Sequence, residues 1–373
     1  MSKTNILDDT ARIRKIDKSN MLSFCVDAPK HYEEAVKIAR KSSIGYLKPQ
    51  KIIVAGMGGS AIGGELVKDW ARDKALVPIE VEREYSLPAY ADKNTLVFVV
   101  SYSGETEETL SVFLDAIRRG CMVVCVSSGG KLLEFAEKFG LPYIRIPSGM
   151  PPRTALPYLF MPLLISLEKI GLVSNVNTEV AEAIKVLEKV SSENMSEKPL
   201  SINFSKALAL KVNGTVPVVY GFGFYRAVAQ RFKQQFNENS KIPAKWEILP
   251  ELNHNEIVGW ERAGKMAKNF SAFFLRDKDE PKEIRDRIEA TKELMRKVCK
   301  EKVKIFEVWS SGESMLAKML STICIGDFTS VYLALLRKVD PTPVKTIAML
   351  KEKMKQSGMK EKILRELEKM VDK

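Results

Sequence analysis

Gly56-Met-Gly-Gly-Ser-Ala-Ile-Gly-Gly64 is the stretch that decides the fold. The apolar run Lys51-Ile-Ile-Val-Ala55 precedes it, and a helix-like segment, residues 65–71, follows it. This order predicts a strand, a glycine turn and a helix start, where unpaired backbone N–H groups and the positive end of the helix dipole face outward. The stretch therefore predicts a site for an anionic, oxygen-rich ligand.

Three residues of this glycine loop are candidates for ligand contact. Gly58 and Gly59 lack a Cβ and so let a ligand approach the backbone, and Ser60 adds a hydroxyl. The alternative is a dinucleotide-binding fold, in which the usual acidic residue about 20 positions further on would be Glu80 or Glu82.

A second unit of the same kind follows. Leu96-Val-Phe-Val-Val100 predicts a strand, and Ser101-Tyr-Ser-Gly-Glu-Thr-Glu-Glu-Thr109 is a hydroxyl-rich loop that opens another helix, with Ser103 as the expected N-cap. The hydroxyls of Ser101, Ser103 and Thr106 could hold an oxyanion that also accepts backbone N–H bonds. The alternative is that these hydroxyls only cap and turn the chain, but the neighbouring glycine loop favours a site.

Three acidic residues, Glu105, Glu107 and Glu108, lie in or next to this loop. Their negative charge would repel a dianion bound to the hydroxyls. We therefore expect all three side chains to point to solvent.

Strand-like and helix-like runs alternate as far as residue 146, and the same order recurs after residue 217. This alternation predicts an α/β fold with two similar units, each a parallel sheet covered by helices, and a C-terminal helical segment. The expected strands are 51–55, 77–81, 96–100, 122–127, 143–146, 269–275 and 303–309, with a strand and glycine loop over 217–225. The expected helices are 31–41, 65–71, 107–119, 131–139, 156–170, 227–237, 281–299, 327–337 and 344–372.

Polar and proline-rich stretches indicate the domain borders. Residues 1–172 are predicted to form an N-terminal helix and the first domain, and residues 173–210 a helical connection. Residues 211–330 are predicted to form the second domain, and residues 331–373 a charged C-terminal helical tail that packs across the body.

Composition predicts a globular protein of the cytoplasm, since 45% of the 373 residues are hydrophobic and 28% are charged. No apolar run is expected to reach the ~20 residues of a membrane span, and the polar stretch Met1 to Lys18 is not typical of a secretory signal. The five cysteines are odd in number and form no C-x-x-C pair, which fits a reducing compartment. We therefore expect no membrane partner.

The formal charge of +12 favours anionic ligands. Nucleic acid is the rival partner, but the basic residues are interleaved with acidic ones and no recognised nucleic-acid motif accompanies them, so we do not expect it. Only two histidines, His31 and His254, are present, and a histidine-rich metal site is not expected.

Three residues could carry charge or acid–base chemistry. Arg153 follows two prolines in a rigid turn that would hold its guanidinium for a cleft; the alternative is a solvated loop arginine. Glu238 ends a predicted helix, and His254 lies in the polar run Asn253-His-Asn-Glu256 rather than on an apolar face. A carboxylate with a histidine provides a general base and a second proton shuttle, which is enough for proton abstraction beside a carbonyl.

Five motifs occur along the chain in a fixed order. They are Gly-Met-Gly-Gly-Ser-Ala-Ile-Gly-Gly at 56–64, Ser-Tyr-Ser-Gly-x-Thr-Glu-Glu-Thr at 101–109, Pro-Pro-Arg at 151–153, Asn-Glu-Asn at 237–239 and Asn-His-Asn-Glu at 253–256. Over about residues 20 to 355 the chain thereby resembles the bifunctional phosphoglucose/phosphomannose isomerases of archaea and some bacteria, which belong to the phosphoglucose isomerase superfamily and contain two sugar isomerase (SIS) domains. The resemblance implies two SIS-type domains and an aldose–ketose isomerase that interconverts glucose 6-phosphate and mannose 6-phosphate with fructose 6-phosphate through an enediolate.

The resemblance also implies a role for each candidate residue. Arg153 would stabilise the enediolate, Glu238 would move the proton between C1 and C2, and His254 would help to open the sugar ring. Lys351 is our choice for a C-terminal lysine that assists ring opening, with Lys345 as the competitor. The residues implied to hold the sugar phosphate are Ser60, Ser101, Ser103 and Thr106, with Gly58 and Gly59 lining the pocket.

In this superfamily the histidine comes from the neighbouring subunit, so the resemblance implies a homodimer with shared active sites. No cofactor and no metal are implied. A threonine near the C-terminal lysine would make room for mannose 6-phosphate, and Thr342 is the candidate. The family usually has asparagine where this chain has Glu105, which leaves the charge of the phosphate loop open.

Three other functions remain as alternatives. A non-catalytic SIS protein that senses a sugar phosphate would keep the hydroxyls but would not need Glu238 or His254. A SIS enzyme that acts on an amino sugar normally carries a further amidotransferase domain or partner. A nucleotide-binding dehydrogenase would bind a dinucleotide at the glycine loop.

Overall fold

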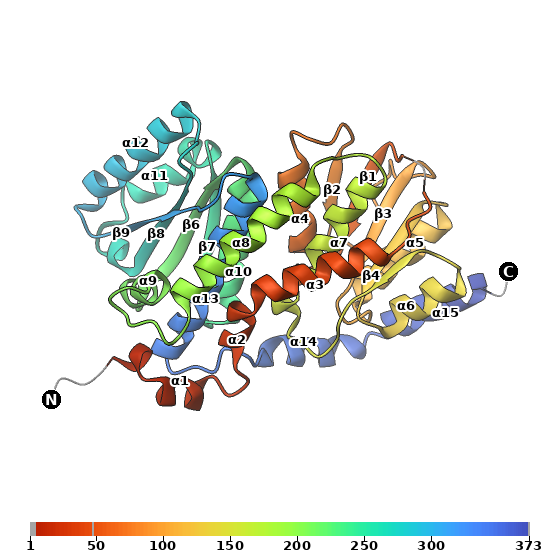
Figure 1. Ribbon diagram of the computed structural model, residues 1–373, viewed down its shortest axis with the longest axis horizontal. Coiled ribbons are helices and arrows are strands. Elements are labelled where there is room, and N and C mark those ends of the chain that lie inside the picture. The colour runs from red at the N-terminus through yellow and green to blue at the C-terminus, as the bar shows by residue number, and fades with distance from the viewer. Residues whose placement is uncertain (1–4, 47, 372–373) are drawn as a thin grey trace. The chain divides into compact units, whose positions relative to one another are not determined.

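The computed structural model describes residues 5–46 and 48–371 and has two compact units, each with its own parallel sheet (Figure 1). The five-stranded unit comprises Lys30–Val176 and the segment from Val344 onward, and the four-stranded unit comprises the segment ending at Pro29 and Asn177–Pro343. The two helix-covered parallel sheets confirm the predicted α/β class. These units differ in range from the domains predicted above, which remain a prediction. Residues 1–4 and 372–373, at the ends of the first and last predicted segments, lie outside the described residues.

The five-stranded sheet has the order β2-β1-β3-β4-β5, with all neighbouring strands parallel. Its central strand β3 (Thr95–Val100) is buried along its whole length, as expected for a parallel strand covered on both faces. The other strands are β1 (Lys51–Ala55), β2 (Ile79–Glu82), β4 (Met122–Ser127) and β5 (Tyr143–Arg145).

Helices cover both faces of this sheet (Figure 1). On one face lies α4 (Gly59–Ala71), so close that a Cβ added to Gly64 would stand 2.7 Å from Cγ1 of Val54. On the other face, Ile363 and Leu367 of α15 (Met359–Val371) join one buried cluster with side chains of α5 (Glu107–Arg118) and α6 (Gly130–Lys138). The remaining elements are α3 (Ala28–Lys41), η2 (Pro152–Thr154), α7 (Leu156–Lys169) and α14 (Lys345–Lys355).

The four-stranded sheet has the order β7-β6-β8-β9 and is also parallel throughout. Its strands are β6 (Val216–Phe222), β7 (Lys245–Leu249), β8 (Phe270–Arg276) and β9 (Lys304–Trp309). Phe236 of α10 (Arg226–Glu238) packs on one face, with its ring 5.7 Å from that of Phe273. Trp260 of α11 (Glu256–Trp260) packs on the other face, with its ring 5.7 Å from that of Phe270.

The remaining elements of this unit complete its two helical layers. They are η1 (Ile6–Asp8), α1 (Thr10–Ile16), α2 (Met21–Val26), α8 (Val176–Asn194), α9 (Phe204–Val212), η3 (Gly223–Tyr225), η4 (Glu251–His254), η5 (Gly264–Asn269), α12 (Lys282–Cys299) and α13 (Met315–Leu336).

The helix α13 is longer and more apolar than the sequence led us to expect. It has 22 residues and an 18-residue window of mean hydropathy 1.6, so the prediction that no apolar run approaches the length of a membrane span is wrong. Because 89% of that window is buried within the structure, α13 has the surroundings of a core helix, which is apolar on all sides.

Several element bounds also differ from the predictions. α4 begins at Gly59 rather than at residue 65, because Gly58 completes the turn at once with a φ of 51°. α13 begins at Met315 rather than at residue 327, and the predicted terminal helix is two helices separated at Gly358, where φ is 65°. Strand β7 was not predicted at all.

Candidate active site

The turn between β1 and α4 leaves open space beside its backbone. Gly58 has the left-handed φ of 51° that glycine adopts readily, and a Cβ added there would meet no atom within 4 Å. As the N-cap of α4 it supplies no side chain to bond the first helical N–H groups. A ligand can therefore come close to the start of α4, where the helix dipole favours an anion.

Gly59 allows two backbone segments to pack closely. A Cβ added to Gly59 would stand 2.9 Å from the carbonyl O of Pro152, and one added to Gly63 would stand 2.7 Å from that of Leu159. The missing side chains let α4 lie directly against η2 and α7. The glycine loop therefore places the start of α4 beside the turn that carries Arg153.

The glycine loop and the hydroxyl loop meet at Ser60. Its buried Oγ accepts a hydrogen bond from the backbone N of Tyr102 at 3.2 Å. Two motifs that are separate in the sequence therefore lie side by side at the carboxyl end of the sheet.

Ser101 and Thr106 form the inner part of the hydroxyl loop. Their side-chain oxygens lie 3.0 Å apart, and Ser101 Oγ also accepts a hydrogen bond from the N of Gly104 at 3.1 Å. Ser103 is exposed, and its Oγ accepts a hydrogen bond from the N of Glu105 at 3.3 Å. The three hydroxyls thus surround one short turn at the start of α5.

The N-cap of α5 is Thr106, so the prediction that Ser103 caps this helix is wrong. The Thr106 side chain does not bond the N–H groups of α5, because its Oγ1 turns toward Ser101 instead. Its own cap therefore leaves the first turn of α5 open to an external acceptor.

The prediction that the acidic side chains of this region point to solvent holds for Glu105, which is exposed, whereas Glu107 and Glu108 are half-buried. Glu105 accepts a hydrogen bond from the N of Lys131 at 2.8 Å and forms an ion pair with Lys360 of α15. Glu107 accepts a hydrogen bond from the hydroxyl of Tyr85 at 3.0 Å. The Lys360 ammonium offsets the charge of Glu105, so that charge opposes a bound anion less than the sequence suggests.

Tyr102 is a residue of this region that the sequence analysis missed. Its hydroxyl accepts a hydrogen bond from the N of Met150 at 2.8 Å, and its carbonyl O accepts one from Ser128 Oγ at 2.7 Å. Burial raises the pKa of the Tyr102 phenol. The Tyr102 hydroxyl therefore connects the hydroxyl loop to the segment that leads to Arg153, by a bond to a backbone N–H that no sequence motif could reveal.

Arg153 lies in η2 and is only 2% exposed, so the alternative of a solvated loop arginine is wrong. Pro151 and Pro152 restrict the backbone before it, as the sequence predicts. A guanidinium keeps its positive charge in proteins even when it is buried. Arg153 therefore brings a permanent positive charge into the five-stranded unit.

The C-terminal candidates lie on or just before α14, which has no buried residue. Lys345 is the first residue of this helix, and Lys351 lies in its second turn. The N of Thr342 donates a hydrogen bond to Asp340 Oδ1 at 3.0 Å. Among the described residues, no hydrogen bond joins either lysine to the hydroxyl loop, so the choice between Lys351 and Lys345 stays open.

Glu238 is the last residue of α10 in the four-stranded unit. Its neighbour Asn239 is buried, and Asn239 Nδ2 donates a hydrogen bond to Ser330 Oγ of α13 at 2.9 Å. The ammonium of Lys241 donates a hydrogen bond to the carbonyl O of Glu238. These contacts hold the backbone on both sides of the Glu238 carboxylate.

His254 is exposed at the end of η4, and its two asparagine neighbours anchor the turn. Asn253 Nδ2 donates a hydrogen bond to Thr291 Oγ1 of α12 at 2.8 Å. Asn255 Nδ2 donates one to Glu251 Oε1 at 2.8 Å. The turn is thus attached to its own unit while the imidazole reaches the surface.

The same motif ends at Glu256, whose side chain is hydrogen-bonded within the four-stranded unit. Its Oε1 accepts a hydrogen bond from the Tyr220 hydroxyl at 2.7 Å, and Trp260 Nε1 donates to that hydroxyl at 3.3 Å. Burial raises the pKa of the Glu256 carboxyl and also that of the Tyr220 phenol.

Comparison with known proteins places the chain among sugar-phosphate enzymes. Residues 202–354 match the family described as bacterial phospho-glucose isomerase C-terminal SIS domain. A bifunctional phosphoglucose/phosphomannose isomerase of Caldicellulosiruptor bescii is 41% identical over 90% of this chain and 98% of its own length. The chain belongs to the family of bifunctional phosphoglucose/phosphomannose isomerases.

Two further proteins are also similar to this chain. The D-glucosamine-6-phosphate 4-epimerase of Sulfolobus acidocaldarius is 35% identical over 61% of this chain and 68% of its own length. The crystal structure of a hypothetical protein from Thermus thermophilus superposes with a TM-score of 0.72 over 93% of this chain and 94% of its own, at 15% identity. The second likeness shows that the fold is shared.

Within the five-stranded unit, the structure brings most of the candidate residues of the family motifs to one end of the sheet. Those residues lie at the starts of α4 and α5 and in η2, and they are Gly58, Gly59, Ser60, Ser101, Ser103, Thr106 and Arg153. Glu238 and His254 belong to the four-stranded unit.

Proposed function

We propose that this chain interconverts glucose 6-phosphate and mannose 6-phosphate with fructose 6-phosphate through an enediolate, by acid–base catalysis without a metal. The observation that carries the proposal is the start of α5, where Ser101, Ser103 and Thr106 surround a helix terminus that its own cap leaves open. A phosphate is the kind of anion that such a terminus favours. Membership of the isomerase family supplies the reaction.

The phosphate would be held by the four hydroxyls of Ser60, Ser101, Ser103 and Thr106. The hydrogen bond between Ser60 Oγ and Tyr102 N supports this assignment, because it joins the two loops. Gly58 and Gly59 would line the pocket, and the open space beside Gly58 supports a close approach of the sugar.

The proton would be moved between C1 and C2 by Glu238, and Arg153 would stabilise the negative enediolate. General acid–base catalysis typically contributes ~10²–10⁴-fold to the rate, and a preorganised charge beside a developing oxyanion contributes at least as much. The burial of Arg153 supports its role, since a charge away from solvent is less screened.

Ring opening would depend on His254, with Lys351 as an assisting cation. We propose that the protein is a homodimer in which each His254 serves the site of the neighbouring subunit. The exposure of His254 on a turn anchored by its neighbours supports this arrangement. The proposed location is the cytoplasm, in glycolysis and gluconeogenesis, which agrees with five buried cysteines that form no disulfide.

One coupled assay tests the reaction. The purified protein is given fructose 6-phosphate with a chelator, and glucose 6-phosphate and mannose 6-phosphate are measured separately. Formation of both is expected. Glucosamine 6-phosphate is the comparison substrate, and a protein that converts only this amino sugar would contradict the proposal in favour of the epimerase-like activity of its relative.

A mixing experiment tests the shared sites. Glu238→Gln and His254→Ala are each expected to be inactive, but a mixed dimer would hold one site with both residues intact. Random exchange of subunits should then restore about a quarter of the wild-type activity. Absence of any recovery, with exchange verified by tagged subunits, would contradict a site built from two subunits.

A further inference from the structure

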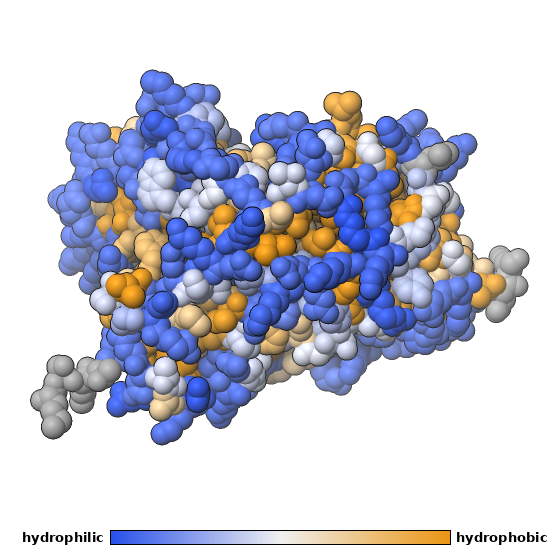
Figure 2. Space-filling view, viewed as in Figure 1, coloured by the Kyte–Doolittle hydropathy of each residue, from blue (hydrophilic) through white to orange (hydrophobic). Residues whose placement is uncertain are grey.

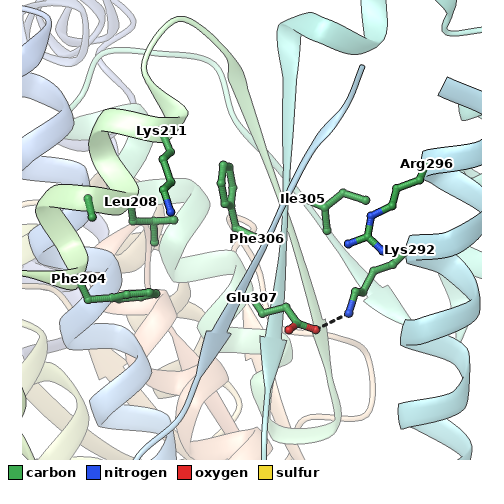
Figure 3. A pocket seen from close by; sticks show the side chains of 9 residues that line it. Phe204, Leu208, Lys211, Lys292, Arg296, Ile305, Phe306 and Glu307 are labelled. Carbon is green, nitrogen blue, oxygen red and sulfur yellow. Dashed lines mark hydrogen bonds and ion pairs between the residues drawn. The ribbon is translucent and has the colours of Figure 1, made fainter. Parts of the chain in front are cut away.

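A groove of ≈ 270 Å³ lies at the outer edge of β9 in the four-stranded unit (Figure 3). Three consecutive residues of β9 line it, Ile305, Phe306 and Glu307. Consecutive strand residues point to opposite faces of a sheet, so a cavity that touches all three must lie at the strand edge. None of the residues assigned to catalysis or phosphate binding lines this groove.

The edge of β9 offers backbone groups to a further strand. Among the described strands β9 pairs only with β8, so N–H and C=O groups on its other side have no neighbouring strand. Such an edge is a template for strand addition unless another segment covers it.

Two helices form walls on either side of this edge (Figure 3). On one side lies α9, whose Phe204, Leu208 and Lys211 face the Phe306 ring. On the other side lies α12, whose Lys292 donates a hydrogen bond to Glu307 at 2.6 Å. Arg296, one turn further along α12, completes that wall.

The two walls differ in chemistry. The α9 wall is mainly apolar: Phe204 is 45% exposed, and Ile202, two residues before it, is 66% exposed. Apolar residues also lie among the polar ones on the face of the molecule in Figure 2. The α12 wall carries Lys292 and Arg296. Lys292 is already paired with Glu289 and Glu307, so the exposed Arg296 is the cation that this wall offers to a guest. Three basic side chains and one acidic side chain line the groove, which gives it a net charge of +2.

We propose that this groove binds an extended acidic segment of a partner protein, which adds to the sheet as a fifth strand beside β9. Side chains of a strand alternate between two faces, so apolar residues of the guest would contact the α9 wall and its carboxylates would contact the α12 wall. A second copy of this chain fits less well, because two edges with a charge of +2 each would repel one another.

The test uses a fluorescein-labelled eight-residue peptide in which Glu alternates with Val and one Val is replaced by Phe. Its binding to the full-length protein is followed by fluorescence anisotropy at low salt. We expect saturable binding that weakens at least tenfold when every second amide is N-methylated, because N-methylation removes the backbone donors of the added strand. The same peptide with Lys in place of Glu should not bind.

Matched variants locate the site. Arg296→Glu and Lys211→Glu should each weaken binding of the acidic peptide about tenfold or more, which is the effect expected when a cation at the interface is reversed. The control is Lys282→Glu, an exposed lysine of the same helix α12 about 21 Å from Arg296. Circular dichroism and urea unfolding confirm that each variant is folded before it is titrated.

Three outcomes would overturn the proposal. The first is no saturable binding of the acidic peptide at about 1 mM. The second is equal binding of the N-methylated peptide, which would mean that side chains alone are recognised. The third is that a labelled single-stranded oligonucleotide of twelve thymidines binds more tightly than the peptide and that the same variants lose this binding. Exposed aromatic rings and cations also suit single-stranded nucleic acid.

Discussion

The carboxyl ends of the two sheets carry similar serine- and glycine-containing loops. The two loops differ in whether they provide an acceptor for the first N–H groups of the helix that follows. In the five-stranded unit the loop Ser101 to Thr106 opens α5, and its cap does not bond the first helical N–H groups. In the four-stranded unit the loop Ser310 to Ser314 opens α13, and Ser314 Oγ accepts a hydrogen bond from the N of Ala317 at 3.3 Å. Only one of the two caps therefore satisfies its own helix.

The four-stranded unit also supplies its own anion at this position. Glu182 of α8 accepts hydrogen bonds from the N of Glu313 at 2.6 Å and from the N of Ser314 at 3.0 Å. Burial would raise the pKa of the Glu182 carboxyl, but these backbone donors lower it below its ordinary value. A carboxylate of the chain thus occupies the place that an external phosphate would take.

At the end of the neighbouring strand β8, in the same unit, one buried arginine forms ion pairs with carboxylates of the chain. Arg276 is 3% exposed and pairs with Glu280 at 2.5 Å and with Glu289 at 2.7 Å. The comparison teaches that the same strand-loop-helix unit can supply its own counter-charge at the helix start, as at α13, or leave that place to a ligand, as we propose for α5. It supports the proposal that phosphate binds in the five-stranded unit.

The largest expected effect is a loss of turnover that leaves binding of the sugar phosphate nearly unchanged. Glu238→Gln removes the proposed base from the four-stranded unit and should lower kcat by ~10²–10⁴-fold or more. Binding of sorbitol 6-phosphate, which has no carbonyl to isomerise, should stay within about threefold of wild type by calorimetry. Equal loss of turnover and binding would mean that Glu238 is structural.

The second prediction gives the start of α5 the kind of carboxylate that the start of α13 already has. Thr106→Glu places a carboxylate at the start of α5, as Glu182 does for α13, and should weaken sorbitol 6-phosphate binding about 100-fold through repulsion and lost hydrogen bonds. Thr106→Gln has nearly the same shape without the charge and is the control. If both variants bind alike, charge at this terminus does not decide the specificity.

The third prediction removes the carboxylate from the start of α13. Glu182→Ala leaves the N–H groups of Glu313 and Ser314 without their acceptor and should lower the free energy of unfolding by about 1–2 kcal/mol in urea. Inorganic phosphate should restore part of that loss. Glu188→Ala, an exposed position on the same helix, should cost little, and an equal loss in both variants would contradict the capping role.

The smallest expected effect is a pH dependence of stability that comes from Glu256, two residues after His254. Because burial raises the pKa of Glu256 in the folded protein, its contribution to stability is complete below the unfolded value of 4.5 and is lost as pH rises through the raised pKa. Glu256→Gln cannot ionise and keeps an acceptor for Tyr220, so its free energy of unfolding should lack this fall with rising pH. The fall that is removed should amount to less than about 1 kcal/mol. Urea unfolding between pH 4 and 8 measures it, with the exposed Glu261→Gln as control.

The sequence predicts best where local chemistry decides the structure. Strand β1 has the predicted bounds because a short apolar run between polar and glycine residues suits a buried parallel strand. Strand β7 was missed because its sequence, Lys-Trp-Glu-Ile-Leu, mixes exposed and buried positions at the edge of a sheet. Edge strands lack the uniform burial that makes a run recognisable.

The site was predictable to a similar degree. The hydroxyls and glycines could be found because they occur together after strands, but their partners could not. Glu105 meets Lys360 across 255 positions of the chain, and the cap moves from Ser103 to Thr106 because the hydroxyl of Thr106 has Ser101 as a neighbour. Such pairings depend on the folded sheet and leave no local pattern.

The packing of α15 has a consequence for how the protein is made. Ile363 and Leu367 belong to the same buried cluster as Val97 of β3, so the layer behind the proposed phosphate loops is incomplete until the last helix has been synthesised. Val176 and Met359 are separated by 183 positions, which a ribosome covers in about 10 to 40 s. During translation, the five-stranded unit must therefore wait with one face of its sheet partly uncovered while the other unit emerges.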